Sequence, residues 1–582
     1  MKLEKVIIGS LFATILLLSI STAVQAQELT EVNVNEILEK IENGEDVYYE
    51  NVRIMGELNL REIELKTVSI EQKTSIGSEE ELKIVLSEIT IRDSIFENNV
   101  ILSKAQFKKP LNLGGTSFLG KVSFNGSNIE EDITLYSATF NDRVDFSGAT
   151  FNGRVEFLGA TFNDRVDFSG ATFNDETFFL SATFNYGHFS DATFNGRVDF
   201  LDATFSGFTF FESATFNDDA CFAIVTFNGF AEFRSATFNG SSEFHSATFN
   251  DPTSFESAIF NNLAEFQGAT FNGGANFRRA TFDSGVAFNM ATFDSGVDFE
   301  SATFNGNSNF RSATFNYGHF LDAIFNGSVF FHRATFNDEA VFEHATFNGE
   351  TYFEHATFND NLIFKDSDFK DDANFYNATF NAYASFSSTF NKVDFSKTKF
   401  NDLDLRGIDF ECMEVSWSSI ENVLVFDGPA YTKLIKNFRE IEQFDDADDA
   451  YFQYRDLSRA NKDLSISNIE ESVSKIEDTF FWVTCGYGVK PLYTIGVGAI
   501  IVLLFSIFYK VGDGICRLAG NNVSKISLYD AFYFSTITFT TVGFGDWYPK
   551  DKYRILVIIE GLLGWLTLAL FLISLVNVMI RL

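Results

Sequence analysis

Large apolar residues recur every eleven positions through the middle of the chain, beginning at Phe96. A second series lies six residues after members of the first, so the apolar intervals alternate between six and five residues. Two intervals of the first series shrink to ten, and each contains the sequence NYGHF. This regularity indicates repeated structural units. The first series runs through Phe96, Phe107, Phe118, Ile129, Phe140, Phe151 and Phe162, and continues to Phe380.

An α-helix does not fit this pattern. A helix would hold an eleven-residue repeat on one face only if positions three and four residues apart were also apolar, and here these are mostly Asn, Asp, Gly, Ser and Arg. A solenoid does fit, because each short extended segment supplies one inward residue before Asn-Gly or Asn-Asp turns the chain. Stacked coils would place Phe on Phe at about 4.8 Å spacing.

The repeating unit, as in ATFNDRVDFSG, resembles the pentapeptide-repeat family in a Phe-rich form over about Val52 to Phe410. The resemblance implies an all-β, right-handed quadrilateral β-helix. The extra residue in alternate units departs from strict fives, which leaves the coil size open; four sides would take about 22 residues. We expect residues 96–410 to form the β-helix and residues 27–95 to form its N-terminal capping region.

The N-terminus has the layout of a secretory signal. Two lysines precede an apolar run from Val6 to Ile20, and small residues lead to a cleavage site expected after Ala26. An uncleaved signal anchor is the alternative, because residues 6–24 are nearly long enough to span a bilayer. We therefore interpret residues 1–26 as a signal peptide or signal anchor.

Apolar residues change to helical spacing after the repeats end: Leu434, Phe438, Ile441 and Phe444 lie three or four residues apart. We expect residues 411–490 to form a helical linker between the solenoid and the membrane. Four aspartates in it could sense a divalent cation, or form an ordinary solvated helix face, which is the commoner role of such a run. They are Asp445, Asp446, Asp448 and Asp449.

Two apolar stretches near the C-terminus, residues 492–509 and 553–580, are long enough to span a membrane. The segment between them, residues 527–546, contains aspartates and glycines and is a poor spanning helix. Its first half predicts a short aromatic helix, and its second half has an open, glycine-punctuated backbone. Irregular backbone at membrane depth must be buried or line an aqueous path, where its carbonyls could replace the water around a cation.

The sequence TVGFGD at positions 541–546 resembles the filter motif of two-helix potassium channels, with Phe replacing the commoner Tyr. The resemblance covers residues 491–582 and includes the short helix and both flanking spans in order. It implies a homotetramer in membrane lipid, with K⁺ as the permeant ion and no cofactor. The implied K⁺-binding filter is Thr541, Val542, Gly543, Phe544 and Gly545. The carbonyl groups of the first four residues and the Thr541 hydroxyl would coordinate the ion. Asp546 would lie at the outer lip of the filter.

Two residues of the second span could contribute to the pore. Gly564 lies where the inner helix of that family often bends, which makes it a candidate gating hinge; a small residue that eases helix packing is the equal alternative. Glu560 is an ionisable residue inside a span, and such residues are costly and usually functional. It could support the pore by a hydrogen bond behind the filter, for example to Thr538, or lie at the interface.

Charge and composition exclude several function classes. The formal net charge of −37 argues against nucleic-acid binding, because a phosphate backbone is repelled by an acidic surface. The four cysteines form no CxxC pair, and the six histidines occupy variable positions of the repeat, where we interpret them as solvated surface groups. No catalytic constellation stands out. We expect a protein that is not an enzyme, with no metal other than K⁺ at the filter.

These patterns together predict a K⁺ channel subunit that carries a large acidic repeat domain of unknown ligand. The alternative is a membrane-anchored binding or adhesion rod with a vestigial pore; DNA mimicry by the rod would require a cytoplasmic location. Family polarity places the rod inside the cell, whereas the signal segment and the basic residues favour an external rod. Lys510, Arg517, Lys525, Lys550, Lys552 and Arg554 flank the pore loop, against Lys475, Lys490 and Arg581 on the other side.

Overall fold

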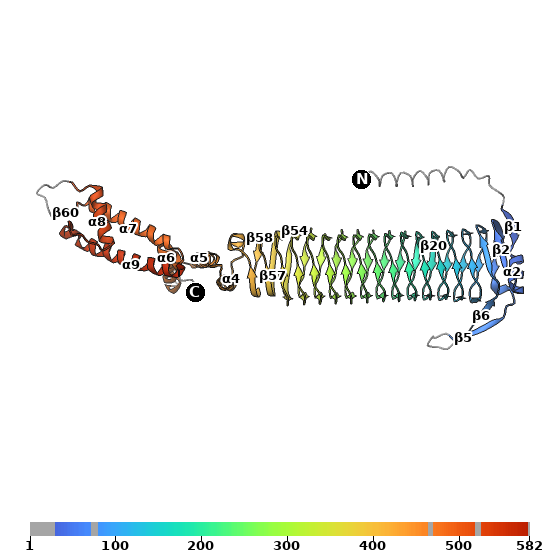
Figure 1. Cartoon of the computed structure of the whole chain (residues 1–582). Helices are drawn as coiled ribbons and strands as arrows, with labels where there is room; N and C mark the ends of the chain where they lie inside the picture. Colours follow the sequence, from blue (N-terminus) through green and yellow to red (C-terminus); the bar gives the residue numbers. More distant parts are fainter. Residues whose placement is uncertain (1–28, 72–78, 464–468, 518–524, 580–582) are drawn as a thin grey trace, which may run out of the picture. The chain divides into compact units, whose positions relative to one another are not determined.

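The computed structural model describes residues 29–71, 79–463, 469–517 and 525–579 (Figure 1). The predicted signal segment, residues 1–26, lies outside the described residues. The chain divides into two compact units: the first ends at Ala382 and also includes Ser388–Asn391, and the second takes Tyr383–Ser387 and continues from Lys392. The division therefore falls within one long strand, β57 (Thr379–Asp394).

In the first unit, strand β1 (Thr30–Asn33) is followed by a short helix, α2 (Val34–Asn43), that contacts the first strands of the solenoid. The Asn33 side chain caps its N-terminus by accepting a hydrogen bond from the Asn35 amide, and Gly44 ends it with a left-handed φ of 72°. One face of α2, which includes Ile37 and Ile41, is fully buried. An apolar helix face at this end covers core side chains that the first coils would otherwise expose to water.

The solenoid consists mostly of two-residue parallel strands, and most of them pair with the strand four places later. For example, β12 (Ser117–Phe118) pairs with β16 (Thr139–Phe140), so that Phe118 lies opposite Phe140, 22 residues on. Four strands and 22 residues therefore make one coil. Figure 1 shows the coils stacked side by side along the region labelled β20 to β54. The expected quadrilateral β-helix is confirmed.

Phenylalanine rings fill the interior in continuous stacks. The Phe118 and Phe140 rings lie 4.9 Å apart and those of Phe140 and Phe162 4.8 Å apart, with interplanar angles of 4° and 1°. A neighbouring column meets the next edge-on, as in the Phe157–Phe168 pair at 79°. The stack spacing equals the separation of hydrogen-bonded strands, so the backbone repeat dictates the ring repeat. One large side chain on each side of the coil therefore fills the core.

Asparagine side chains form hydrogen-bonded ladders at the corners of the coils. The Asn174 amide donates to the Asn152 side-chain oxygen at 2.7 Å, and Asn195 donates to Asn174 at the same distance. Each side-chain amide group is both donor and acceptor, so identical residues one coil apart, 21 or 22 positions along the chain, satisfy one another. The corner sequence repeated along the chain thus stabilises the stack from outside while phenylalanine fills it from inside.

The second unit starts with the last strands of the solenoid and a helical cap. Helix α4 (Gly428–Glu440) carries Asn437, whose side-chain amide donates to the Met413 carbonyl at 2.8 Å and whose side-chain oxygen accepts from the Met413 amide at 2.9 Å. Met413 lies in strand β59 (Asp409–Glu414). Because an uncovered strand edge invites pairing with other chains, this buried Asn closes the sheet without a further strand.

Two more linker helices follow, α5 (Phe444–Ala460) and α6 (Ile469–Cys485). Asp478 on α6 accepts hydrogen bonds from Arg455 and Lys462, both at 2.6 Å, which ties the two helices together. Burial works to raise the pKa of Asp478, but these two cationic donors outweigh it and hold the pKa below its ordinary value. The buried carboxylate is therefore paired and ionised.

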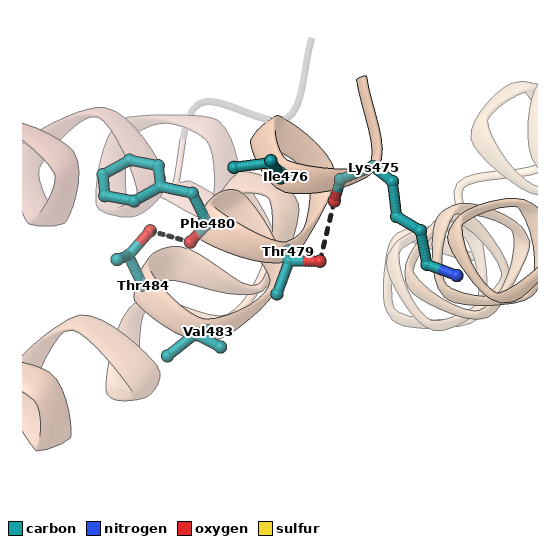
Figure 2. A pocket seen from close by; sticks show the side chains of 6 residues that line it. All are labelled: Lys475, Ile476, Thr479, Phe480, Val483 and Thr484. Carbon is teal, nitrogen blue, oxygen red and sulfur yellow. Dashed lines mark hydrogen bonds between the residues drawn. The ribbon is translucent and has the colours of Figure 1, made fainter. Parts of the chain in front are cut away.

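Helix α6 carries a mostly apolar hollow that Lys475 also lines (Figure 2). Ile476, Phe480 and Val483 lie in it and are 62%, 46% and 47% exposed. The hydroxyls of Thr479 and Thr484 donate to carbonyls of their own helix, at 2.7 and 2.6 Å, so they present little polarity outward. The helix that leads into the first apolar span thus has an open apolar side.

Candidate functional site

Among the described residues, two helices are long and apolar enough to cross a membrane. They are α7 (Pro491–Val511) and the helix that contains α9 (Arg554–Met579). Both expose large apolar side chains along their length, including Leu503 at 52% and Leu566 at 53%. A surface of this kind is stable against lipid and unfavourable in water.

Helix α8 (Leu528–Phe539) packs between them, in contact with both α7 and α9. Its N-terminus carries a capping box, because Ser527 accepts from the Asp530 amide and the Asp530 carboxylate accepts from the Ser527 amide, each at 3.1 Å. Its inner face carries Ala531 and Phe534, which pack against Tyr509 of α7. A short helix is thereby held rigidly with its C-terminus at the loop that follows.

The backbone after α8 alternates in conformation. Thr541, Gly543 and Gly545 have positive φ values of 58°, 52° and 75°, whereas Val542 and Phe544 between them do not. A positive φ is accessible to glycine but strained for a threonine, so surrounding contacts must hold it.

Hydrogen bonds to the end of α8 provide that hold. The Thr541 amide donates to the Thr538 carbonyl at 3.0 Å, and the amides of Val542 and Gly543 donate to the Ile537 carbonyl at 3.0 and 3.3 Å. The amides of this segment are therefore directed at the helix end. The carbonyl groups of residues 541–543 accept none of the hydrogen bonds named above.

The outer end of the loop is tied to the segment that follows α7. Strand β60 (Ile515–Arg517) pairs antiparallel with β61 (Trp547–Pro549), which begins directly after Asp546. The Tyr533 hydroxyl donates to the Asp546 carboxylate at 3.5 Å. Asp546 is thus anchored beside the loop at its far end, where the sequence places the lip.

Glu560 is fully buried between the three helices of this module. Its carboxylate accepts a hydrogen bond from the Tyr509 hydroxyl of α7 at 2.7 Å and another from the Ser535 hydroxyl of α8. The expected polar partner exists, but it is Ser535 and Tyr509 instead of Thr538. Three helices share one hydrogen-bonded carboxyl group, which fixes the short helix relative to both spans.

Gly564, one turn further along α9, touches the end of α8. A Cβ placed on it would lie 2.0 Å from the Phe539 carbonyl oxygen, too close for any side chain. The Phe539 ring in turn covers Gly498 of α7, where a Cβ would lie 3.2 Å from the ring. This close approach gives Gly564 a packing role, whereas its role as a hinge stays a prediction.

The structure brings the predicted residues into two groups. Residues 541–546 form one continuous loop, and Glu560 and Gly564 lie behind α8, against the helix that supports that loop. The sequence interpretation missed Ser535 and Tyr509. A hydroxyl inside each of two apolar segments, facing a lone acid in a third, is the signal that could have identified them.

Two family models match the chain. A model described as ion channel matches residues 492–581. A model described as pentapeptide repeats (9 copies) matches six segments, residues 113–161, 157–204, 233–281, 310–357, 320–367 and 342–389. No curated protein matches the chain. The fusion of a pentapeptide-repeat solenoid with a two-span ion-channel module, expected from the sequence, is confirmed, and both parts point to a protein without enzymatic function.

Proposed function

We propose that this chain, which joins pentapeptide repeats to an ion-channel domain, is a subunit of a K⁺-selective channel whose filter is residues 541–545. The observation that carries the proposal is the alternating backbone of that segment, anchored at the end of α8. A backbone whose φ changes sign from each residue to the next can direct successive carbonyl groups toward the same side. A row of carbonyls is the ligand set that replaces the water around a K⁺ ion.

The position of α8 supports the same function. The C-terminal end of a helix carries partial negative charge, and α8 ends at Phe539, directly before the filter segment. A cation approaching the filter from that end is favoured. Glu560 and Gly564 act as supports in this scheme, because both fix the position of α8 through Ser535 and Phe539.

One chain supplies one wall of the conducting path, so several copies are needed to surround an ion. Val542 and Phe544 are 55% and 69% exposed in the single chain, although both are apolar. Neighbouring subunits would cover them. The number four follows from the resemblance to potassium channels, and the homotetramer is part of the proposal.

Membrane lipid is the expected surrounding of this module. The apolar hollow of α6, lined by Ile476, Phe480 and Val483, lies on the helix that directly precedes α7. An amphipathic helix next to a span can bury such a side among lipid headgroups and acyl chains. Lipid contact therefore accounts for this exposed surface as well as for those of α7 and α9.

Ion flux through the purified full-length protein in liposomes tests the selectivity. We expect K⁺ flux to exceed Na⁺ flux by more than about tenfold, which corresponds to about 1.4 kcal/mol of discrimination. Carbonyl ligands arranged for a dehydrated K⁺ ion would produce this difference. Equal permeability to the two ions, or no flux of either, would remove the basis for a K⁺ channel.

We also propose that the solenoid lies outside the cell, on the basis of the signal segment and the basic residues that flank the pore loop. A membrane-impermeant thiol reagent applied to intact cells tests this, in a chain without its own cysteines. Asp218→Cys, at an exposed solenoid corner, should be labelled, whereas Lys552→Cys, between the filter and α9, should be protected. The reverse result would place the solenoid in the cytoplasm.

A further inference from the structure

Between residues 96 and 380, two coils are one residue shorter than their neighbours, and both contain the sequence NYGH. In the first, β23 (Thr183–His188) pairs with β20 (Thr161–Asp167) so that His188 lies opposite Asp167. In the second, β47 (Gly318–His319) pairs with β43 (Val297–Asp298) so that His319 lies opposite Asp298. In both, the His Nδ1 lies 3.1 Å from an Asp carboxylate oxygen.

An arginine occupies the first of these Asp–His pairs. The Arg165 Nη2 lies 2.8 Å from Asp167 Oδ2 and 2.9 Å from His188 Nδ1, and the guanidinium packs over the Tyr186 ring at 5.1 Å. The Asp167 side chain is only 9% exposed. This coil therefore shows that a positive charge fits between the two side chains.

The second pair differs at the two positions that matter. Gly296 stands where the first coil has Arg165, and Glu300 stands where it has Ser169. With no side chain at Gly296, a hollow of about 430 Å³ opens beside the pair, and the Asp298 side chain is 31% exposed. The hollow is lined by Asn276, Arg278, Gly296, Asp298, Tyr317 and His319.

We propose that Asp298, Glu300 and His319 bind a divalent transition-metal ion of the Zn²⁺ type. One ligand atom from each of the three lies within 4.8 Å of the others. A tetrahedral ion with bonds of about 2.0–2.1 Å needs its ligand atoms about 3.4 Å apart, a distance that half-exposed side chains can reach by rotating. Three protein ligands leave the fourth position to water or to an outside ligand.

The ligand set decides the class of ion. An imidazole nitrogen with two carboxylate oxygens suits Zn²⁺ and its neighbours in the first transition row, whereas Ca²⁺ and Mg²⁺ prefer oxygen ligands alone. The negative charge of the two carboxylates also exceeds the positive charge near them, because Arg278 is the one cation recorded beside them in the described structure. Its Nη2 lies 2.8 Å from Glu300 and its Nη1 3.6 Å from Asp298.

In this scheme Arg278 competes with the metal ion for the carboxylates of Asp298 and Glu300. Its side chain is 37% exposed and can rotate into solvent when an ion enters. Arg165 is similarly exposed, at 36%, but its rotation would uncover Asp167, whose side chain is only 9% exposed. Removal of the Arg278 charge should therefore strengthen metal binding. The first short coil, with arginine in place and serine in place of the glutamate, is the natural control within the same chain.

Zn²⁺ titration of the full-length, chelator-treated protein in detergent tests the proposal. We expect one site per chain that is lost, by at least about tenfold in affinity, in Glu300→Gln and His319→Gln, while His188→Gln leaves it unchanged. Arg278→Gln should tighten it. Co²⁺ absorption provides a second readout, because nitrogen and oxygen ligands at a tetrahedral site give bands that an unspecific surface ion does not.

A gain-of-site variant sharpens the test. Arg165→Gly combined with Ser169→Glu gives the first short coil the same three ligand residues as the second, and the stoichiometry should rise from one to two ions per chain. Binding that survives His319→Gln, or Ca²⁺ and Mg²⁺ binding as strong as Zn²⁺ binding, would overturn the assignment. So would a stoichiometry that stays at one in a folded double variant, as judged by unchanged circular dichroism.

Discussion

Gly543→Val is expected to reduce K⁺ flux at least about 100-fold while leaving the chain folded in the membrane. Gly543 has a φ of 52°, a conformation in which a β-branched residue is strained by about 1–3 kcal/mol. In the proposed tetramer the strain is repeated four times around one axis, roughly 4–12 kcal/mol in all. A factor of 100 corresponds to only about 2.7 kcal/mol, so strain of this size is enough to disrupt the conducting geometry.

The same substitution at Gly561 is the matched control for the flux measurement. Gly561 lies in α9, its backbone is helical, and an added Cβ meets no atom of the described chain within 4 Å, as at Gly543. Both variants should elute as the same oligomer in detergent, and Gly561→Val should still conduct. Wild-type flux in Gly543→Val would contradict a filter at residues 541–545 and favour a membrane-anchored rod with a vestigial pore.

The coil of the solenoid could be predicted because its cause is local. Apolar intervals of six and five residues fix how far the chain runs before the next inward side chain, and four such sides give the pairing of Phe118 with Phe140. The open backbone of residues 541–545 was equally predictable, because glycines permit the positive φ values found at 543 and 545. In both cases residue type and spacing along the chain contain the whole signal.

Contacts between distant segments could not be predicted in the same way. Thr538 was the expected partner of Glu560, but α8 presents Ser535 to it, one turn earlier, and α7 adds Tyr509 from 51 positions away. Which side of a short apolar helix faces a neighbour depends on packing that periodicity does not reveal. His319 was interpreted as a solvated surface group, yet it lies beside Asp298 because one deleted residue changes the register.

Phe244→Ala is expected to destabilise the solenoid locally by about 3–5 kcal/mol, the usual cost of removing a buried phenylalanine side chain. Phe244 is 0% exposed, and its ring stacks at 4.8 Å on both Phe222 and Phe266. It also meets Phe255 edge-on at 5.5 Å. A rigid backbone spacing prevents the neighbouring rings from closing the cavity, so we expect the cost near the upper end of that range.

Hydrogen exchange of the full-length protein measures this effect where it arises. Coils contact mainly their neighbours, so the defect should appear in the coils of residues 222–266, with exchange faster by roughly two to four orders of magnitude. Phe208→Ala is the matched control, because Phe208 is 56% exposed and its loss should change stability by less than about 0.5 kcal/mol. Equal exchange in the two variants would mean that the stacked rings do not stabilise the rod, and faster exchange along the whole solenoid would mean that its coils unfold as one cooperative unit.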